Sequence, residues 1–78
     1  MKLPPTKTFA DRIKHLRVLR GFTQAQLARA CDPRINVTTV SSWERGNHEP
    51  RMSRIAPLAK ALGATVLWLA EGKGPLPE

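Results

Sequence analysis

The chain has 78 residues, which suits one small domain and leaves too little buried surface for both a core and a deep catalytic cleft. Hydrophobic residues make up 41% of it in short periodic groups, and neither a membrane-length apolar run nor a secretory signal is seen, so we expect a cytoplasmic protein without a membrane partner. Thirteen Lys and Arg against six Asp and Glu give a net charge of +7, which favours a polyanionic partner, nucleic acid before an anionic membrane.

The first two helices are marked by their capping residues. Thr8 is predicted to cap the first helix, because its hydroxyl can accept from first-turn amides, and Asp11 suits the positive helix N-terminus. Apolar residues follow at helical spacing until Gly21 ends the helix: Phe9, Ile13 and Leu16. Thr23 and Gln26 then form a capping box for a second, short helix that carries Leu27, Ala28 and Cys31.

A third helix is predicted between a proline break and a glycine. The break is Asp32-Pro33-Arg34, because proline disfavours helix in the residue before it and cannot donate to the helical hydrogen-bond ladder. Asn36 is a suitable cap, and Val40 and Trp43 are expected to face inward. Gly46 ends the helix.

Two more helices are predicted toward the C-terminus. The fourth ends at Gly63 and carries four apolar residues at helical spacing: Ile55, Leu58, Ala59 and Leu62. Pro57 is unfavourable inside a helix, so either the regular helix begins near Pro57 or the segment from Met52 is kinked. Thr65 caps the fifth helix, which Gly72 ends, and its apolar residues are Val66, Trp68 and Leu69.

Five short helices without a strand pattern predict an all-α, compact five-helix bundle over residues 8–72. A flexible basic arm is expected at 1–7, and a tail or the start of a linker at 73–78. The single cysteine, Cys31, is interpreted as a small buried residue, and no metal-ligand spacing is present, so neither a metal nor another cofactor is expected. Scattered carboxylates and the lack of a Ser-His-Asp arrangement or glycine-rich phosphate loop argue against an enzyme and a small-molecule substrate.

Three sequence blocks carry a family resemblance. They are GFTQAQLA at 21–28, VSSWERG at 40–46 and LAKALG at 58–63, with a Trp-Leu pair after them. In this order they resemble the lambdoid phage repressor family of Cro/C1-type helix-turn-helix domains, over nearly the whole chain from Phe9 to Gly72. The resemblance implies a lambda-repressor-like fold whose helix at 36–45 lies in the major groove of DNA.

The resemblance also assigns roles to individual residues. It implies base readout by Val37, Thr38, Ser41, Ser42 and Arg45. It implies contacts to the DNA backbone by Thr23, Gln24, Asn36, Asn47, His48 and Arg51. Arg17 and Glu44 take the positions of a partly buried ion pair that orients the reading helix. From the residues alone, Val37 fits the core as well as a thymine methyl contact, and Trp43 and Trp68 are expected to be core or interface aromatics.

The chain departs from the close family pattern between Leu27 and Val40. A longer connection, Cys31-Asp32-Pro33-Arg34-Ile35, replaces a glycine turn there. Because the Trp-Glu-Arg-Gly block after this connection is intact, positions counted back from it are better defined than Asn36, Val37 and Thr38, which depend on the turn.

The expected function is sequence-specific binding of double-stranded DNA by a transcriptional repressor. One reading helix covers only a few base pairs, so a homodimer on a palindromic operator is expected, with the fifth helix and Trp68 as the candidate dimer surface. The alternatives are a helical protein-interaction module and a small complete regulator of the Cro or antitoxin kind. The charge of +7 and the polar outer face of the third helix favour DNA.

Overall fold

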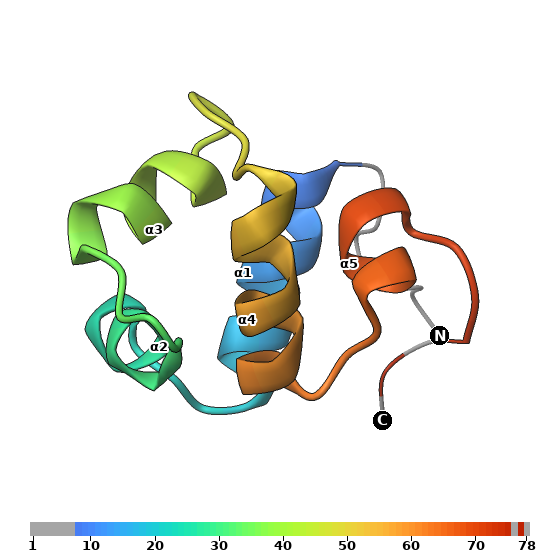
Figure 1. The fold of residues 1–78 in the computed structure, drawn as a ribbon, viewed down its shortest axis with the longest axis horizontal. Helices are drawn as coiled ribbons and strands as arrows, with labels where there is room; N and C mark the ends of the chain where they lie inside the picture. Colours follow the sequence, from blue (N-terminus) through green and yellow to red (C-terminus); the bar gives the residue numbers. More distant parts are fainter. Residues whose placement is uncertain (1–7, 76, 78) are drawn as a thin grey trace.

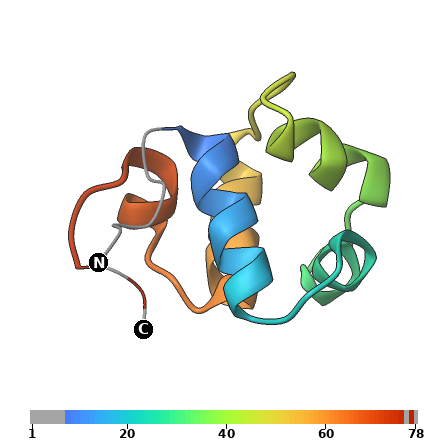
Figure 2. The ribbon, with the colours of Figure 1, turned by 180° about the vertical axis from the view of Figure 1, so that it is seen from behind.

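The computed structural model describes residues 8–75 and 77. Within these ranges it contains five helices and no strand: α1 (Phe9–Leu19), α2 (Gln24–Ala30), α3 (Val37–Glu44), α4 (Met52–Leu62) and α5 (Val66–Glu71). α1 and α4 occupy the middle, with α2 and α3 at one end and α5 at the other (Figure 1; seen from behind in Figure 2). The predicted all-α five-helix fold is confirmed, whereas the arm expected at 1–7 lies outside the described residues.

Four of the five helices begin at the capping residues that the sequence predicts. The Thr8 hydroxyl accepts from the Asp11 amide at 3.1 Å, and the Thr65 hydroxyl accepts from the amide of Trp68 at 3.0 Å. Both bonds of the capping box are formed in α2, at 3.1 Å from the Gln26 amide and at 2.8 Å to the Gln26 side chain. These bonds satisfy amides that have no partner inside the helix, so they fix where each helix starts.

α4 is regular from Met52 onward, with Pro57 inside it. The helix therefore does not begin near Pro57, which rules out one of the two predicted alternatives. Proline removes only the hydrogen bond that its own amide would donate to the Ser53 carbonyl, and the apolar face of α4 compensates by burying Ile55 and Leu58 on either side of Pro57. α4 has no side-chain cap at Arg51.

The core lies between α1 and α4 and extends to both ends of the molecule. Its members are Phe9, Ile13, Leu16, Leu27, Ala28, Cys31, Val40, Trp43, Ile55, Leu58, Ala59, Leu62, Trp68 and Leu69. Phe9 and Trp43 join α1 to α3 edge to face, with ring centroids 6.5 Å apart. Cys31 is buried as expected, and this burial raises the pKa of its thiol, against a lowering effect of Arg54.

Trp68 does not contribute a dimer surface, which corrects the prediction made for it. Its side chain is 1% exposed, and Leu69 beside it is fully buried. Both neighbours face inward because the short α5 packs against α1 and α4 together. The exposed apolar residues of α5 are instead Val66 and Leu67. The indole Nε1 of Trp68 has no hydrogen-bond partner among the described residues.

One arginine in α1 and the C-cap residue after it close the C-terminal ends of other helices, which the sequence did not predict. Arg12 is 5% exposed and donates from Nε to the Leu69 carbonyl and from Nη2 to the Ala70 carbonyl, both at 2.8 Å. Arg20 donates from Nε to the Leu62 carbonyl at 2.8 Å, at the end of α4. A cation there offsets the negative helix terminus and satisfies carbonyls that lack helical partners.

No helix within residues 8–75 and 77 is long and apolar enough to cross a membrane. In the same part of the chain, no group of three or more His, Cys, Asp or Glu side chains is placed to hold a metal ion.

Candidate nucleic-acid interface

An ion pair joins α1 to the end of α3. Nε of Arg17 donates to Oε2 of Glu44 at 2.6 Å and Nη2 donates to Oε1 at 3.1 Å, while Nη1 donates to the Phe22 carbonyl at 2.8 Å. The two side chains are 14% and 4% exposed. A planar guanidinium that binds both carboxylate oxygens restricts their relative orientation. The structure thus contains the ion pair that the family resemblance implies.

Gln24, the first residue of α2, adds a third partner to this network. Its side-chain amide donates to Oε1 of Glu44 at 3.2 Å. The carboxylate of Glu44 therefore receives hydrogen bonds from α1 and from α2, and it lies at the last residue of α3. Gln24 is half-buried and bonded to Glu44. It can make the phosphate contact expected of it only if the bond to Glu44 is kept or is exchanged for a bond to the phosphate.

α3 has a buried face and an outward face. Val40 is fully buried and Trp43 is 5% exposed, whereas Val37 is 41% exposed, which places it outside the core. The outward face consists of short side chains: Val37 and Thr38 are exposed, and Thr39, Ser41 and Ser42 are half-buried. Four of the five predicted base readers thus lie on α3 outside the core, and the fifth, Arg45, is the exposed C-cap of that helix.

The start of α3 is fixed despite the longer connection before it. Cys31 and Ile35 anchor that connection to the core, and the Ile35 amide donates to the Ala28 carbonyl at 3.1 Å. Oδ1 of Asn36 accepts from the amide and the hydroxyl of Thr38, at 2.9 and 2.8 Å. Asn36 is therefore the N-cap, as predicted, and it is exposed.

The loop after α3 is held to the helix end. Gly46 has φ +77°, which a residue with a side chain adopts only with strain, and its amide donates to the Trp43 carbonyl at 3.1 Å. The Asn47 amide donates to the Ser42 carbonyl, also at 3.1 Å. This arrangement turns the chain so that Asn47 and His48 lie beside α3, with both side chains exposed.

A family model described as helix-turn-helix matches residues 13–69. The chain belongs to the helix-turn-helix family. This confirms the family predicted from the three sequence blocks. The helix-turn-helix chain is also 36% identical over 73 residues to the HTH-type transcriptional regulator DicA of Escherichia coli strain K12. The match covers 90% of this chain and 53% of DicA, so the chain spans about half the length of that curated relative.

Two solved structures share this helix-turn-helix fold. The P22 c2 repressor protein, in complex with synthetic operator 9T in the presence of Tl⁺, matches with a TM-score of 0.79 and 28% identity, over 87% of this chain and 100% of that chain. A hypothetical transcription factor, NHTF from Neisseria, matches with a TM-score of 0.73 and 31% identity, over 99% of this chain and 85% of its own. The lambda-repressor-like architecture is therefore shown.

In this helix-turn-helix domain, some basic residues form contacts within the domain and others are exposed at its surface. Of the thirteen Lys and Arg residues, Arg12, Arg17 and Arg20 bind carbonyls or Glu44 within the domain. Arg45, the C-cap of α3, and Arg51, before α4, are exposed at the end that carries α3. A charge count cannot separate these two groups, because it treats every arginine as available to a partner.

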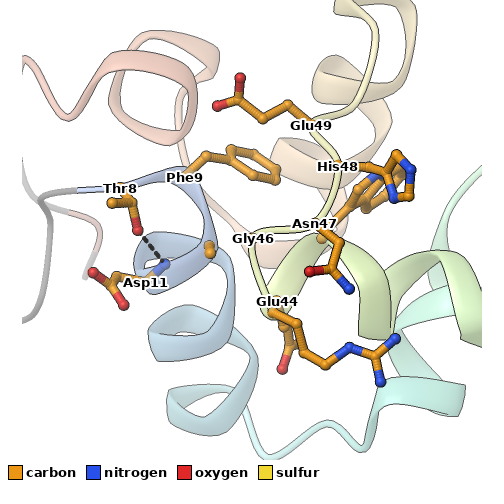
Figure 3. A pocket seen from close by; sticks show the side chains of 11 residues that line it. Thr8, Phe9, Asp11, Glu44, Gly46, Asn47, His48 and Glu49 are labelled. Carbon is orange, nitrogen blue, oxygen red and sulfur yellow. Dashed lines mark hydrogen bonds between the residues drawn. The ribbon is translucent and has the colours of Figure 1, made fainter.

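A hollow of about 660 Å³ separates the start of α1 from the loop after α3. Figure 3 shows Asp11 and Glu49 at this hollow, with His48 on the other side of the loop from the Glu49 carboxylate. These two carboxylates repel a phosphate backbone. The hollow therefore marks the border of the candidate interface, which lies over the outward face of α3 and the exposed side of the loop from Asn47 to His48.

Proposed function

We propose that the chain is a sequence-specific DNA-binding transcriptional regulator of the phage-repressor type, with α3 in the major groove. The fold similarity to the P22 c2 repressor carries this proposal, because that structure contains operator DNA and matches over its whole chain. The outward face of α3 supports it, since an α-helix fits the major groove and no residue of this face belongs to the buried core. In this role the protein represses transcription by covering a promoter.

The side chains of the interface suggest how sequence is read. Before Arg45, the outward face of α3 has no Arg, Lys, Asn or Gln, the residues that make bidentate contacts to bases. Val37 is suited to thymine methyl groups, and Thr38 and Ser41 to single hydrogen bonds. DNA shape supplies further discrimination. Arg45, which the resemblance places among the base readers, also contacts a phosphate, and together with Arg51, Thr23, Asn36 and Asn47 it supplies affinity.

Arg45→Ala tests the electrostatic part of this proposal. We expect the variant to bind all duplex sequences more weakly and to lower the slope of log K against log salt by about one, because one phosphate contact is lost. The measurement is a salt titration of binding to duplexes selected from a random pool. Lys73→Ala is the matched control, because Lys73 is exposed beyond α5 and its loss should leave the slope unchanged.

The same titration distinguishes DNA binding from the alternative function. If the wild-type protein binds no duplex at low salt, the proposal fails and a protein-interaction module remains. If Arg45→Ala and Lys73→Ala reduce the slope equally, the positive charge acts without a defined interface. A steep slope that only Arg45→Ala reduces supports the placement of DNA at α3.

We further propose that a homodimer binds a palindromic operator. α3 has eight residues and spans only a few base pairs, so two copies about 34 Å apart are needed for a specific site. α5 remains the candidate dimer surface, through Val66 and Leu67, which are 39% and 48% exposed. We expect sedimentation with operator DNA to show two protomers per site and Leu67→Glu to weaken operator binding. One protomer per site would contradict the dimer.

A further inference from the structure

Ser42 holds the loop after α3 at two points. Its carbonyl accepts from the Asn47 amide at 3.1 Å, and its hydroxyl oxygen lies 2.6 Å from Nδ1 of His48. The first bond belongs to the helix end and depends only on the backbone. The second is a side-chain contact that a residue without a hydroxyl at position 42 could not make. It places the imidazole of His48 beside α3.

The imidazole lies on the reading side of the helix. His48 lines a shallow hollow of about 330 Å³ with Thr38, Thr39, Ser42 and Trp43. Three of these residues belong to the outward face of α3, so the ring extends that face by one more side chain. The carboxylate of Glu49 points to the opposite side of the loop (Figure 3), and therefore does not draw the ring away from α3.

The direction of the hydrogen bond with Ser42 decides which hydrogen bonds His48 offers. A neutral imidazole has one nitrogen that donates and one that accepts. When the Ser42 hydroxyl donates to Nδ1, the hydrogen of the ring is on Nε2, and Nε2 becomes an outward donor. The Ser42 oxygen keeps only lone pairs for other partners. Ser42 alone is a short side chain, whereas the pair reaches farther and has a defined donor.

We propose that Ser42 and His48 act as one base-reading unit, in which Ser42 positions the ring and Nε2 of His48 donates to an acceptor on a base edge in the major groove. This rests on the proposed DNA-binding function. It changes the role expected of His48 from backbone contact to base readout, and it makes Ser42 mainly a positioning residue. Acceptors of the required kind are N7 and O6 of guanine, N7 of adenine and O4 of thymine.

If Ser42 and His48 form one unit, the effects of their substitutions on base preference should be coupled. Loss of the Ser42 hydroxyl frees the ring to rotate, and loss of the ring removes the donor, so either change should relax preference at the same base pair. The double variant should lose no more than either single variant, because the contact is already lost. Independent readers would instead affect different base pairs and add their effects.

The test is selection of binding sites from random duplex DNA by the wild type and by Ser42→Ala, His48→Ala, the double variant and His48→Asn. We expect discrimination at one base pair to fall about fivefold in each. The side-chain amide introduced by His48→Asn can bond to Ser42 near the Nδ1 position but lacks the outward nitrogen, so this variant separates holding the loop from reading the base. His15→Ala, at the half-buried histidine of α1, is the matched control and should keep the wild-type preference.

The outcomes distinguish this inference from the function on which it rests. Wild-type binding with unchanged preference in His48→Ala overturns the reading unit and leaves DNA binding intact. Additive shifts at two different base pairs, or a His48→Asn variant with wild-type preference, also overturn it. If the wild type binds no duplex at low salt, the proposed function fails and the reading unit fails with it.

Discussion

The Arg17→Ala variant is expected to lose about 3 kcal/mol of unfolding free energy. Its carboxylate partner, Glu44, is only 4% exposed and would lose the guanidinium that compensates it. The Phe22 carbonyl would lose a donor as well. Urea unfolding, followed by the fluorescence of the buried Trp43 and Trp68, measures the change. A domain of this size has a small free energy of unfolding, so the variant should be partly unfolded on mild warming.

A double substitution shows whether the loss comes from the uncompensated charge. Arg17→Met with Glu44→Leu removes both charged groups and keeps most of the buried volume, so it should recover much of the stability lost in Arg17→Ala. If Arg17→Ala costs less than about 1 kcal/mol, the pair behaves as a solvated surface pair, and the anchoring role given to it is wrong.

Arg12→Met is expected to cost a similar amount, about 3 kcal/mol. Methionine keeps an apolar side chain of comparable length, so the variant chiefly removes the bonds to the carbonyls of Leu69 and Ala70, both at 2.8 Å. These carbonyls end α5 and have no helical partner. Burial lowers the pKa of the Arg12 guanidinium, against raising effects of Asp11 and Glu49, but leaves it charged at neutral pH.

Arg29→Met is the control for Arg12→Met. Arg29 is exposed on α2, and its replacement should change unfolding free energy by no more than about 0.5 kcal/mol. Hydrogen exchange gives a second measurement, because loss of Arg12 should release the amides of α5 before those of α1 and α4. Equal stabilities of the two variants would contradict a role of Arg12 in closing α5.

Helix positions were predictable because their signals are local. Thr8, Thr23, Asn36 and Thr65 each bond an amide two or three residues away, so sequence spacing alone identifies them. Pro57 shows the limit of such signals. Proline weighs against a helix locally, but Ile55 and Leu58 bury on the face of α4 that packs on the core, and no local rule contains that contribution.

Features that depend on distant residues were not predictable. Arg12 lies 57 positions from Leu69 in the chain, and Arg20 lies 42 positions from Leu62. Nothing in the neighbouring sequence distinguishes these arginines from exposed ones such as Arg29. Trp68 was placed at a dimer surface for the same reason, because α5 has apolar residues all round and only the positions of α1 and α4 decide which of them is buried.

The candidate site was partly predictable. The ion pair of Arg17 and Glu44 came from the family resemblance, and the structure shows its geometry. The pairing of Ser42 with His48 was missed, although the six-residue spacing across Gly46 holds a signal. A glycine that ends a helix turns the chain back, so a polar residue two positions later can meet one four positions before the glycine. The roles of these residues toward DNA remain predictions.

The separation of the two faces of α3 has a consequence for how such proteins diversify. The residues that hold α3, Val40, Trp43 and Glu44, are different from those that it presents, which lie outside the buried core. If α3 reads DNA as proposed, substitutions at Val37 or Ser41 are expected to change target choice at a stability cost of about 0.5 kcal/mol or less. Ser42 is the exception, because its hydroxyl also holds the loop, so mutational drift there alters two recognition elements together.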